Sequence, residues 1–140
     1  MVHLTGNCMC GAVAWTYSGA LTRNLVCHCI DCQRATSSPV TAFLGMKPEH
    51  LNWTGEIVHY ESTPGTFRGF CSSCGTRLYF RSRKWPLEIH VHAATMTDPG
   101  EYQPDAQVFM RSRVKWLDRL QSLSAHQGFQ QAPSDSADTP

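Results

Sequence analysis

Cys71-Ser72-Ser73-Cys74-Gly75 is the stretch on which the predicted fold depends. Two cysteines separated by two residues and followed by glycine have the sequence of a zinc knuckle. Both sulfur atoms can reach one ion at about 2.3 Å, and the glycine tolerates the positive φ with which the chain turns around the metal. A knuckle supplies half of a tetrahedral site, so we expect two further ligands from elsewhere in the chain.

Five more cysteines lie in two clusters, Cys8-Met9-Cys10-Gly11 and Cys27-His28-Cys29-Ile30-Asp31-Cys32. The first is another two-cysteine unit ending in glycine, and therefore resembles the knuckle more closely. Structural zinc sites have four protein ligands, whereas catalytic sites usually have three and keep one position open. We predict a closed structural site, named the quartet, consisting of Cys8, Cys10, Cys71 and Cys74. The open site, named the trio, consists of Cys27, Cys29 and Cys32.

Other interpretations of the cysteines stay open. Seven is an odd number, which argues against a complete disulfide framework. One or both clusters could nevertheless be free buried thiols or a redox pair, and the trio could form a transient disulfide, as in a redox sensor. His28 or an outside histidine could also complete the trio as a fourth ligand, which would make the second site structural.

Length, composition and charge limit the class of protein. The chain has 140 residues, about the length of one domain, and 41% of them are hydrophobic, enough for a modest core. The formal net charge is +1, so no global field attracts nucleic acid or an anionic membrane. No apolar run approaches the roughly 20 residues of a membrane helix. Residues 1–6 lack the pattern of a signal peptide, so we expect a cytoplasmic protein.

The apolar segments are short, rich in β-branched or aromatic residues, and bounded by turn-forming residues, which is typical of strands. They are residues 12–17, 40–44, 57–60, 66–70, 77–80, 88–93 and 107–110. They predict a mainly β, largely antiparallel fold. A short helical turn is expected from Cys29 to about Ala35, and a helix at residues 113–123, where Trp116, Leu120 and Leu123 share one face. We expect one zinc-binding domain at residues 1–123 and a disordered tail at residues 124–140.

The three clusters and their neighbours resemble the signature of a known family. The matching runs are Gly6-x-Cys8-x-Cys10-Gly11-x-Val13, Cys27-His28-Cys29-x-x-Cys32-Gln33-Arg34, Gly69-Phe70-Cys71-x-x-Cys74-Gly75-Thr76 and Arg113-x-x-Trp116. From about residue 4 to residue 120 the chain is similar to the glutathione-dependent formaldehyde-activating enzymes, whose domain also occurs in centromere protein V. The resemblance implies a β-tent of small antiparallel sheets around a structural zinc, with a catalytic zinc on the trio and so two zinc ions per chain. It also implies condensation of glutathione with formaldehyde to S-(hydroxymethyl)glutathione.

The chemistry of the trio agrees with that implied activity. Three thiolates around Zn²⁺ leave one net negative charge, so the ion is a weaker Lewis acid than one held by three imidazoles. Such a site suits a substrate thiol held as the nucleophilic thiolate beside an aldehyde carbon. We therefore expect a carbon–sulfur lyase-type enzyme whose partners are a glutathione-like thiol and a small aldehyde. The alternative is a non-catalytic interaction module with both zincs structural, for which protein is a better partner than nucleic acid.

Further polar residues are weaker candidates. His90 and His92 share a strand face and could bind a metal or shuttle protons, although a solvated face is the more common place for such a pair. The basic segments at residues 81–84 and 111–115 could meet substrate carboxylates or form solvated surfaces. Five polar residues that follow the trio could orient substrates or simply cap a helix, namely Gln33, Arg34, Thr36, Ser37 and Ser38.

Overall fold

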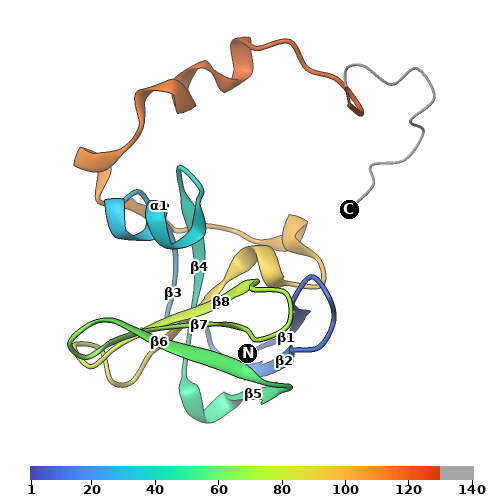
Figure 1. The fold of residues 1–140 in the computed structure, drawn as a ribbon, viewed down its shortest axis with the longest axis vertical. Coiled ribbons are helices and arrows are strands. Elements are labelled where there is room, and N and C mark those ends of the chain that lie inside the picture. The colour runs from blue at the N-terminus through green and yellow to red at the C-terminus, as the bar shows by residue number, and fades with distance from the viewer. Residues whose placement is uncertain (130–140) are drawn as a thin grey trace.

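The computed structural model describes residues 1–129, and Figure 1 draws residues 130–140 as a thin grey trace. Those last residues belong to the tail predicted at residues 124–140, so this part of the prediction lies outside the described residues. Within residues 1–129, no helix combines the length and the apolar content that crossing a membrane requires.

The described residues form ten strands, one α-helix and several short 3-10 helices. The strands are β1 (Val2–Asn7), β2 (Ala14–Gly19), β3 (Arg23–Cys27), β4 (Thr41–Met46), β5 (Leu51–Thr54), β6 (Ile57–Thr63), β7 (Thr66–Cys71), β8 (Arg77–Ser82), β9 (Ile89–His92) and β10 (Ala106–Val108). The helices are α1 (Ile30–Thr36) and the 3-10 helices η1 (Pro48–His50), η2 (Ala93–Thr95), η3 (Pro99–Glu101), η4 (Met110–Ser112) and η5 (Lys115–Ser122). The predicted mainly β class is confirmed.

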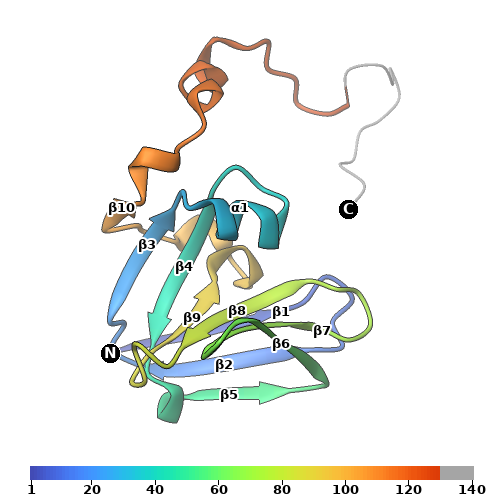
Figure 2. The ribbon, with the colours of Figure 1, turned by 60° about the vertical axis from the view of Figure 1, so that its left-hand side comes forward.

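Two sheets make up the fold (Figures 1 and 2). The smaller has the order β1-β2-β5, and the larger has the order β10-β3-β4-β9-β8-β7-β6. Neighbouring strands are antiparallel except for β10, which runs parallel to β3. An isolated bridge between Gly6 and Met96 connects β1 to the segment after η2. In Figure 2, β3 and β4 extend away from the layers that hold β1, β2 and β5, and α1 lies at their far end.

The main core takes side chains from both sheets. Trp15 and Tyr17, on one face of β2, are each 1% exposed, whereas the residues that alternate with them face solvent. Both bury their polar atoms with partners, because the Trp15 indole N–H donates to Thr95 Oγ1 at 3.0 Å and the Tyr17 hydroxyl donates to the Ala20 carbonyl at 2.7 Å. Burial of these two rings therefore leaves no unpaired indole or phenol.

Each of the seven predicted strands overlaps an observed strand, but three observed strands were missed. These are β1, β3 and β5, in which polar residues interrupt the apolar pattern, such as His3 in β1, Arg23 and Asn24 in β3, and Asn52 in β5. Each pairs with a more apolar strand, β2 or β4, so its place in the sheet is set by a partner distant in sequence.

The predicted helix at residues 113–123 is present as the 3-10 helix η5. Its apolar residues Trp116, Leu120 and Leu123 are about half exposed, so they contribute little to the core. Figures 1 and 2 show this segment beyond α1, on the side away from the small sheet.

Two turn glycines provide a test of backbone packing. Gly55 and Gly65 both have positive φ, 89° and 79°, but a Cβ at Gly55 would overlap the Ala12 carbonyl oxygen, whereas one at Gly65 would meet only the Arg83 side chain at 3.3 Å. We expect Gly65→Ala to lower the free energy of unfolding by about 1–2 kcal/mol, the strain of a left-handed residue. Gly55→Ala should lose roughly a further 1–3 kcal/mol, because backbone must move. Urea unfolding at saturating zinc measures both, and equal losses would contradict the predicted overlap.

Candidate metal centres and substrate pocket

The quartet joins two loops that lie far apart in the sequence. Cys8 and Cys10 follow β1, Cys71 ends β7, and Cys74 lies in the turn before β8. The four Sγ atoms lie within 4.8 Å of one another, with Cys8 and Cys10 Sγ 3.5 Å apart and Cys10 and Cys71 Sγ 3.8 Å apart. Four sulfurs placed tetrahedrally about 2.3 Å from one zinc would be about 3.8 Å apart. The spacing of the quartet therefore fits a zinc ion.

The turns of the quartet have the geometry predicted for knuckles. Gly11 and Gly75 have φ of 78° and 73°, and their backbone N–H groups donate to the carbonyls of Cys8 and Cys71 at 3.1 and 2.9 Å. These turns bring the second cysteine of each pair back towards the first. Only glycine adopts this conformation without strain, which explains its place at the end of both pairs.

The protonation of the quartet also fits a dication. Hydrogen bonds from Thr76 lower the pKa of Cys74 to about 5. A hydrogen bond with the Ala12 backbone lowers the pKa of Cys10. The hydrogen bonds of the Cys10 thiol with Cys8 and Cys74 outweigh this and raise its pKa to about 11. Ionisation of one thiol thus makes ionisation of its neighbours less favourable, and all four are thiolates together only beside a positive ion.

The trio is built where a strand passes into a helix. Cys27 ends β3, Cys29 caps α1, and Cys32 lies in the first turn of α1, where its backbone N–H donates to Cys29 Sγ at 3.3 Å. The three Sγ atoms also lie within 4.8 Å of one another. Cys27 and Cys32 are buried, whereas Cys29 is partly exposed. The trio is therefore the less accessible of the two clusters.

The trio has the donor chemistry of a metal site with three protein ligands. A hydrogen bond from Cys32 lowers the pKa of Cys27, the same bond raises the pKa of Cys32, and burial raises the pKa of Cys29. Three thiolates therefore coexist here only beside a cation. Within residues 1–129, no histidine or carboxylate atom completes this group.

His28 points away from the trio, although it lies between two of its members in sequence. It is 2% exposed, and its Nε2 is 2.9 Å from Gln107 Oε1 on β10. Its backbone N–H donates to the Val108 carbonyl at 3.0 Å. Alternation along the strand thus directs the His28 side chain towards β10. His28 therefore stabilises the pairing of β3 with β10 and is not a ligand of the trio.

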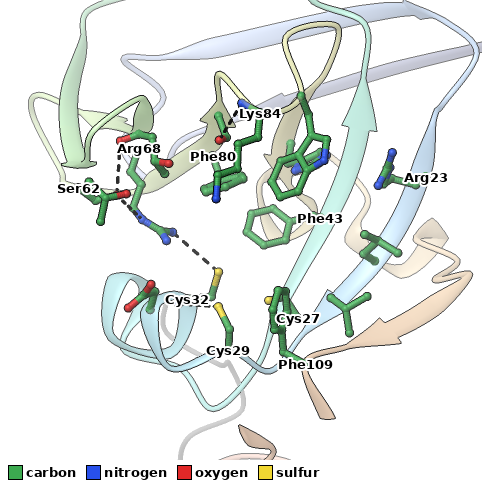
Figure 3. Close-up of a pocket in the computed structure, with 18 residues that line it drawn as sticks. Arg23, Cys27, Cys29, Cys32, Phe43, Ser62, Arg68, Phe80, Lys84 and Phe109 are labelled. Carbon is green, nitrogen blue, oxygen red and sulfur yellow. Dashed lines mark hydrogen bonds between the residues drawn. The ribbon is translucent and has the colours of Figure 1, made fainter. Parts of the chain in front are cut away.

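A cavity of about 390 Å³ opens directly onto the trio. Figure 3 shows the three cysteines at one end, with Phe43, Phe80 and Arg68 across from them. The aromatic walls come from distant segments: Phe43 from β4, Phe80 from β8, and Trp85 and Phe109 from loops. A volume of this size accommodates a small molecule in largely apolar surroundings.

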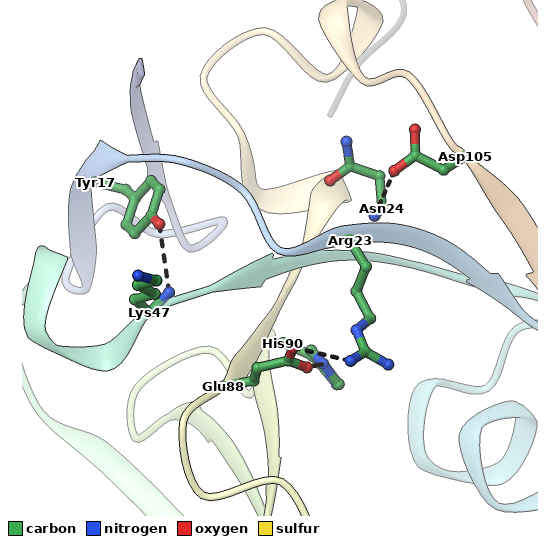
Figure 4. A network of polar contacts seen from close by, with 7 residues as sticks. All are labelled: Tyr17, Arg23, Asn24, Lys47, Glu88, His90 and Asp105. Atoms are coloured by element: carbon green, nitrogen blue, oxygen red, sulfur yellow. Dashed lines mark hydrogen bonds and ion pairs between the residues drawn. The ribbon is translucent and has the colours of Figure 1, made fainter.

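An ion-pair network lies at the side of the cavity (Figure 4). Arg23 Nη2 is 2.9 Å from Glu88 Oε1, and His90 Nε2 is 3.0 Å from Glu88 Oε2. Burial lowers the pKa of His90 despite the neighbouring Glu88. Burial raises the pKa of Glu88, but its bonds with His90 and Arg23 outweigh this and lower it. At neutral pH, the neutral imidazole therefore donates Nε2–H to the Glu88 carboxylate.

The more common placement that we gave for His90 and His92, on a solvated face, is wrong. They are 9% and 7% exposed, because β9 lies inside the larger sheet between β4 and β8. His92 packs on Phe43 with ring centroids 4.8 Å apart, and burial lowers its pKa to about 3. His90 lines the cavity.

The polar residues after the trio have local partners. Gln33 Nε2 donates to the carbonyls of His28 and Ser112, at 2.7 and 3.0 Å, and Thr36 donates to the Cys32 carbonyl at 2.8 Å. Arg34, Ser37 and Ser38 are also not among the residues that line the cavity beside the trio. They form the helix cap and the following loop, as in the alternative interpretation.

The basic residues of the segment at residues 81–84 lie at two different hollows. Lys84 lines the trio cavity, whereas Arg81 and Arg83 line a separate hollow on the other side of β8. Sequence reasoning missed Arg23, Arg68 and Phe43 as cavity residues. Arg68 had a signal that could have found it, because it is the lone charged residue in the apolar segment at residues 66–70.

Comparisons with known proteins agree with this geometry. The family profile described as glutathione-dependent formaldehyde-activating enzyme matches residues 3–112, which include all seven cysteines. An uncharacterized lyase of Schizosaccharomyces pombe is 32% identical over 80 residues, which cover 57% of this chain and 58% of that protein. The match thus spans less than two thirds of the relative. A crystal structure of a Rhodobacter sphaeroides protein has a similar fold, with a TM-score of 0.61 and 20% identity over 74% of this chain and 99% of that one.

Replacement of a quartet sulfur tests its structural role. We expect Cys71→Ser to lose one zinc per chain and to lower the thermal unfolding midpoint by at least about 10 °C, because metal binding here closes a long loop between two sheets. Ser72→Ala, in the same turn but exposed, is the matched control. Elemental analysis and thermal circular dichroism measure the two effects. An unchanged midpoint after loss of the ion would show that the quartet does not stabilise the fold.

Proposed function

The chain belongs to the family of glutathione-dependent formaldehyde-activating enzymes, and we propose that it is a zinc-dependent carbon–sulfur lyase-type enzyme acting on the adduct of a thiol and a small aldehyde. The observation that carries this proposal is the opening of the three trio sulfurs onto a cavity large enough for such an adduct. The reaction resembles that of S-(hydroxymethyl)glutathione synthase. Residues 1–123 would form the zinc-binding domain.

Each metal site has its own role in this proposal. The quartet Cys8, Cys10, Cys71 and Cys74 would hold the structural zinc, and the trio Cys27, Cys29 and Cys32 would hold the catalytic zinc. A zinc ion on the trio supplies the positive charge that keeps a substrate thiol ionised as the nucleophilic thiolate at neutral pH. The three trio cysteines line the cavity, so a substrate thiol would reach the ion from the cavity side.

The cavity walls favour the addition step. The substrate sulfur gives an electron pair to the aldehyde carbon, the carbonyl π pair moves to oxygen, and that oxygen takes up the proton that the thiol released on ionising. Phe43, Phe80 and Trp85 give the cavity apolar walls, which reduce the contact of a bound aldehyde with water. His90 donates Nε2–H to Glu88, so Nδ1 is the ring nitrogen left to exchange a proton with a group in the cavity.

Charge around the cavity supports a thiol that carries carboxylates. Lys84 is exposed at the cavity, and Arg23 has 43% of its side chain exposed although it pairs with Glu88. Together with Arg68 they outnumber Asp31, the acidic residue among those that line the cavity, and so favour a positive potential there that the net charge of the whole chain does not reveal. A glutathione-like thiol, with two carboxylates, matches this potential better than a neutral thiol does.

The non-catalytic alternative requires a fourth protein ligand on the trio. Among residues 1–129 the group has three members, and His28 is bonded to Gln107 instead. This geometry supports the enzyme over an interaction module. No disulfide joins any of the seven cysteines, an arrangement that a reducing compartment maintains, and on this ground we propose a cytoplasmic location.

A substitution in the trio tests the catalytic proposal. We expect Cys29→Ser to lower the rate of glutathione–formaldehyde condensation by about 100-fold or more, because the site loses one of three sulfurs, while the quartet keeps its ion. Arg34→Gln, on the same helix but outside the trio cavity, is the control and should keep full activity. Nuclear magnetic resonance exchange spectroscopy measures the rate above the uncatalysed reaction. Undiminished activity in Cys29→Ser would remove the trio from the mechanism.

A second substitution tests recognition of substrate charge. We expect Lys84→Gln to raise KM for glutathione about 2- to 5-fold, the effect of one exposed ion pair, and to leave KM for 2-mercaptoethanol unchanged. Lys47→Gln, an exposed lysine away from the cavity, should change neither constant. Steady-state kinetics with both thiols measures the difference. An equal change for both thiols would contradict a role of the Lys84 charge.

A further inference from the structure

Arg68 is a buried cation that faces the trio. It lies on β7 and is 7% exposed. Its Nη1 donates to Cys32 Sγ at 3.8 Å, and its Nε donates to Ser62 Oγ at 3.4 Å (Figure 3). The guanidinium carbon lies 5.1 Å from the centroid of the Phe80 ring. One side of the guanidinium thus meets sulfur, and its neighbours on the other sides are a hydroxyl and an aromatic ring.

No carboxylate in the described part of the chain forms an ion pair with Arg68, although Asp31 lines the same cavity. Buried arginines normally pair with an acidic group, because an isolated buried charge is strongly destabilising. The three ion pairs among residues 1–129 involve other cations. Of the groups that contact the guanidinium, the Cys32 sulfur is the one that can carry a full negative charge. We therefore expect the negative charge that balances Arg68 to lie on the trio sulfurs.

We propose that Arg68 is a positioning residue that neutralises the metal complex of the trio, an inference that rests on the proposed function. Three thiolates and one zinc ion carry one net negative charge, and the single positive charge of Arg68 cancels it. Cys27 and Cys32 are each 5% exposed, so water screens that charge poorly. Arg68 thereby raises the affinity of the trio for its ion.

The quartet shows why only one of the two sites needs this partner. Four thiolates around one zinc ion carry two net negative charges. Cys8 and Cys71 are buried, but Cys10 is exposed and Cys74 is partly exposed, so one side of the quartet meets water. Its sulfurs interact with neighbouring thiols, with the Val13 backbone N–H and with the Thr76 hydroxyl, and none of these contacts in the described residues is a cation. Water therefore reaches the quartet through Cys10 and Cys74, whereas the trio has no fully exposed cysteine and has Arg68 beside it.

The same charge also acts on the substrate. Arg68 lines the cavity, so a thiolate that binds at the trio adds its negative charge close to the guanidinium. A metal complex already neutralised by Arg68 accepts this charge more readily than one that carries an uncancelled negative charge. Arg68 therefore favours both the metal and the thiolate form of the substrate.

The test measures the zinc affinity of both sites in the full chain by competition with a chromophoric chelator. In Arg68→Gln and Arg68→Met, which lack the charge, we expect the affinity of the trio to fall about 10-fold or more and that of the quartet to stay unchanged. Arg68→Lys keeps the charge and should recover most of the affinity. Arg77→Gln is the matched control, because Arg77 also stacks on an aromatic ring, 4.9 Å from the centroid of Phe70, without a hydrogen bond to sulfur.

Each outcome bears on the proposal. Wild-type trio affinity in either charge-free variant would overturn it, and so would an equal loss in Arg68→Lys, which would show that shape and not charge matters. If both charge-free variants also fail to load the quartet, Arg68 is a folding residue and the selective effect is refuted. Wild-type protein that binds one zinc per chain would instead refute the proposed function itself, whereas two ions with no effect of Arg68 would refute this inference alone.

Discussion

The convergence of four sulfur atoms from two hairpins is the constraint on which the remaining structure depends. Cys8 and Cys10 follow a strand of the small sheet, whereas Cys71 and Cys74 belong to a turn of the large sheet. Besides the short chain segments that run from one sheet to the other and packing in the common core, the described backbone connects these sheets through the isolated Gly6–Met96 bridge and the hydrogen bond from the Thr97 N–H to the Thr5 carbonyl. A metal on the quartet would add a further link between the two sheets. The large sheet carries β3, β4, β8 and β9, which bring the trio and its cavity together.

The two cysteine sites solve different electrostatic problems with the same ligand. One side of the quartet, formed by Cys10 and Cys74, meets water, and the contacts of its sulfurs are thiols, a hydroxyl and a backbone N–H. The trio lies at the base of a cavity walled by aromatic rings, and a buried guanidinium is its polar neighbour. A fully ligated and solvated ion suits a structural role. An ion with a free side in apolar surroundings suits chemistry, because substrate displaces little water there.

The sequence predicted the metal-ligand groups better than the walls of the cavity. The spacing of the cysteines and the glycines at positions 11 and 75 were enough to divide the sulfurs, because those turns are local. Strands with regular alternation, such as β2, were also predicted, whereas β1, β3 and β5 were not. The cavity depends on register: Phe43 pairs with His92, and Phe80 with His90, only because β9 lies between β4 and β8. Strand order is a property of the whole chain, so local patterns placed both histidines in solvent.

The parallel pair of β10 and β3 has a consequence for the time at which each site can form. His28, beside the trio, meets Gln107 across a separation of 79 residues, and Phe109 completes the nearby wall. During synthesis from the N-terminus, all quartet cysteines are made before this strand is. The nascent chain therefore contains every quartet cysteine at a stage when the cavity beside the trio still lacks Phe109 and the β10 strand.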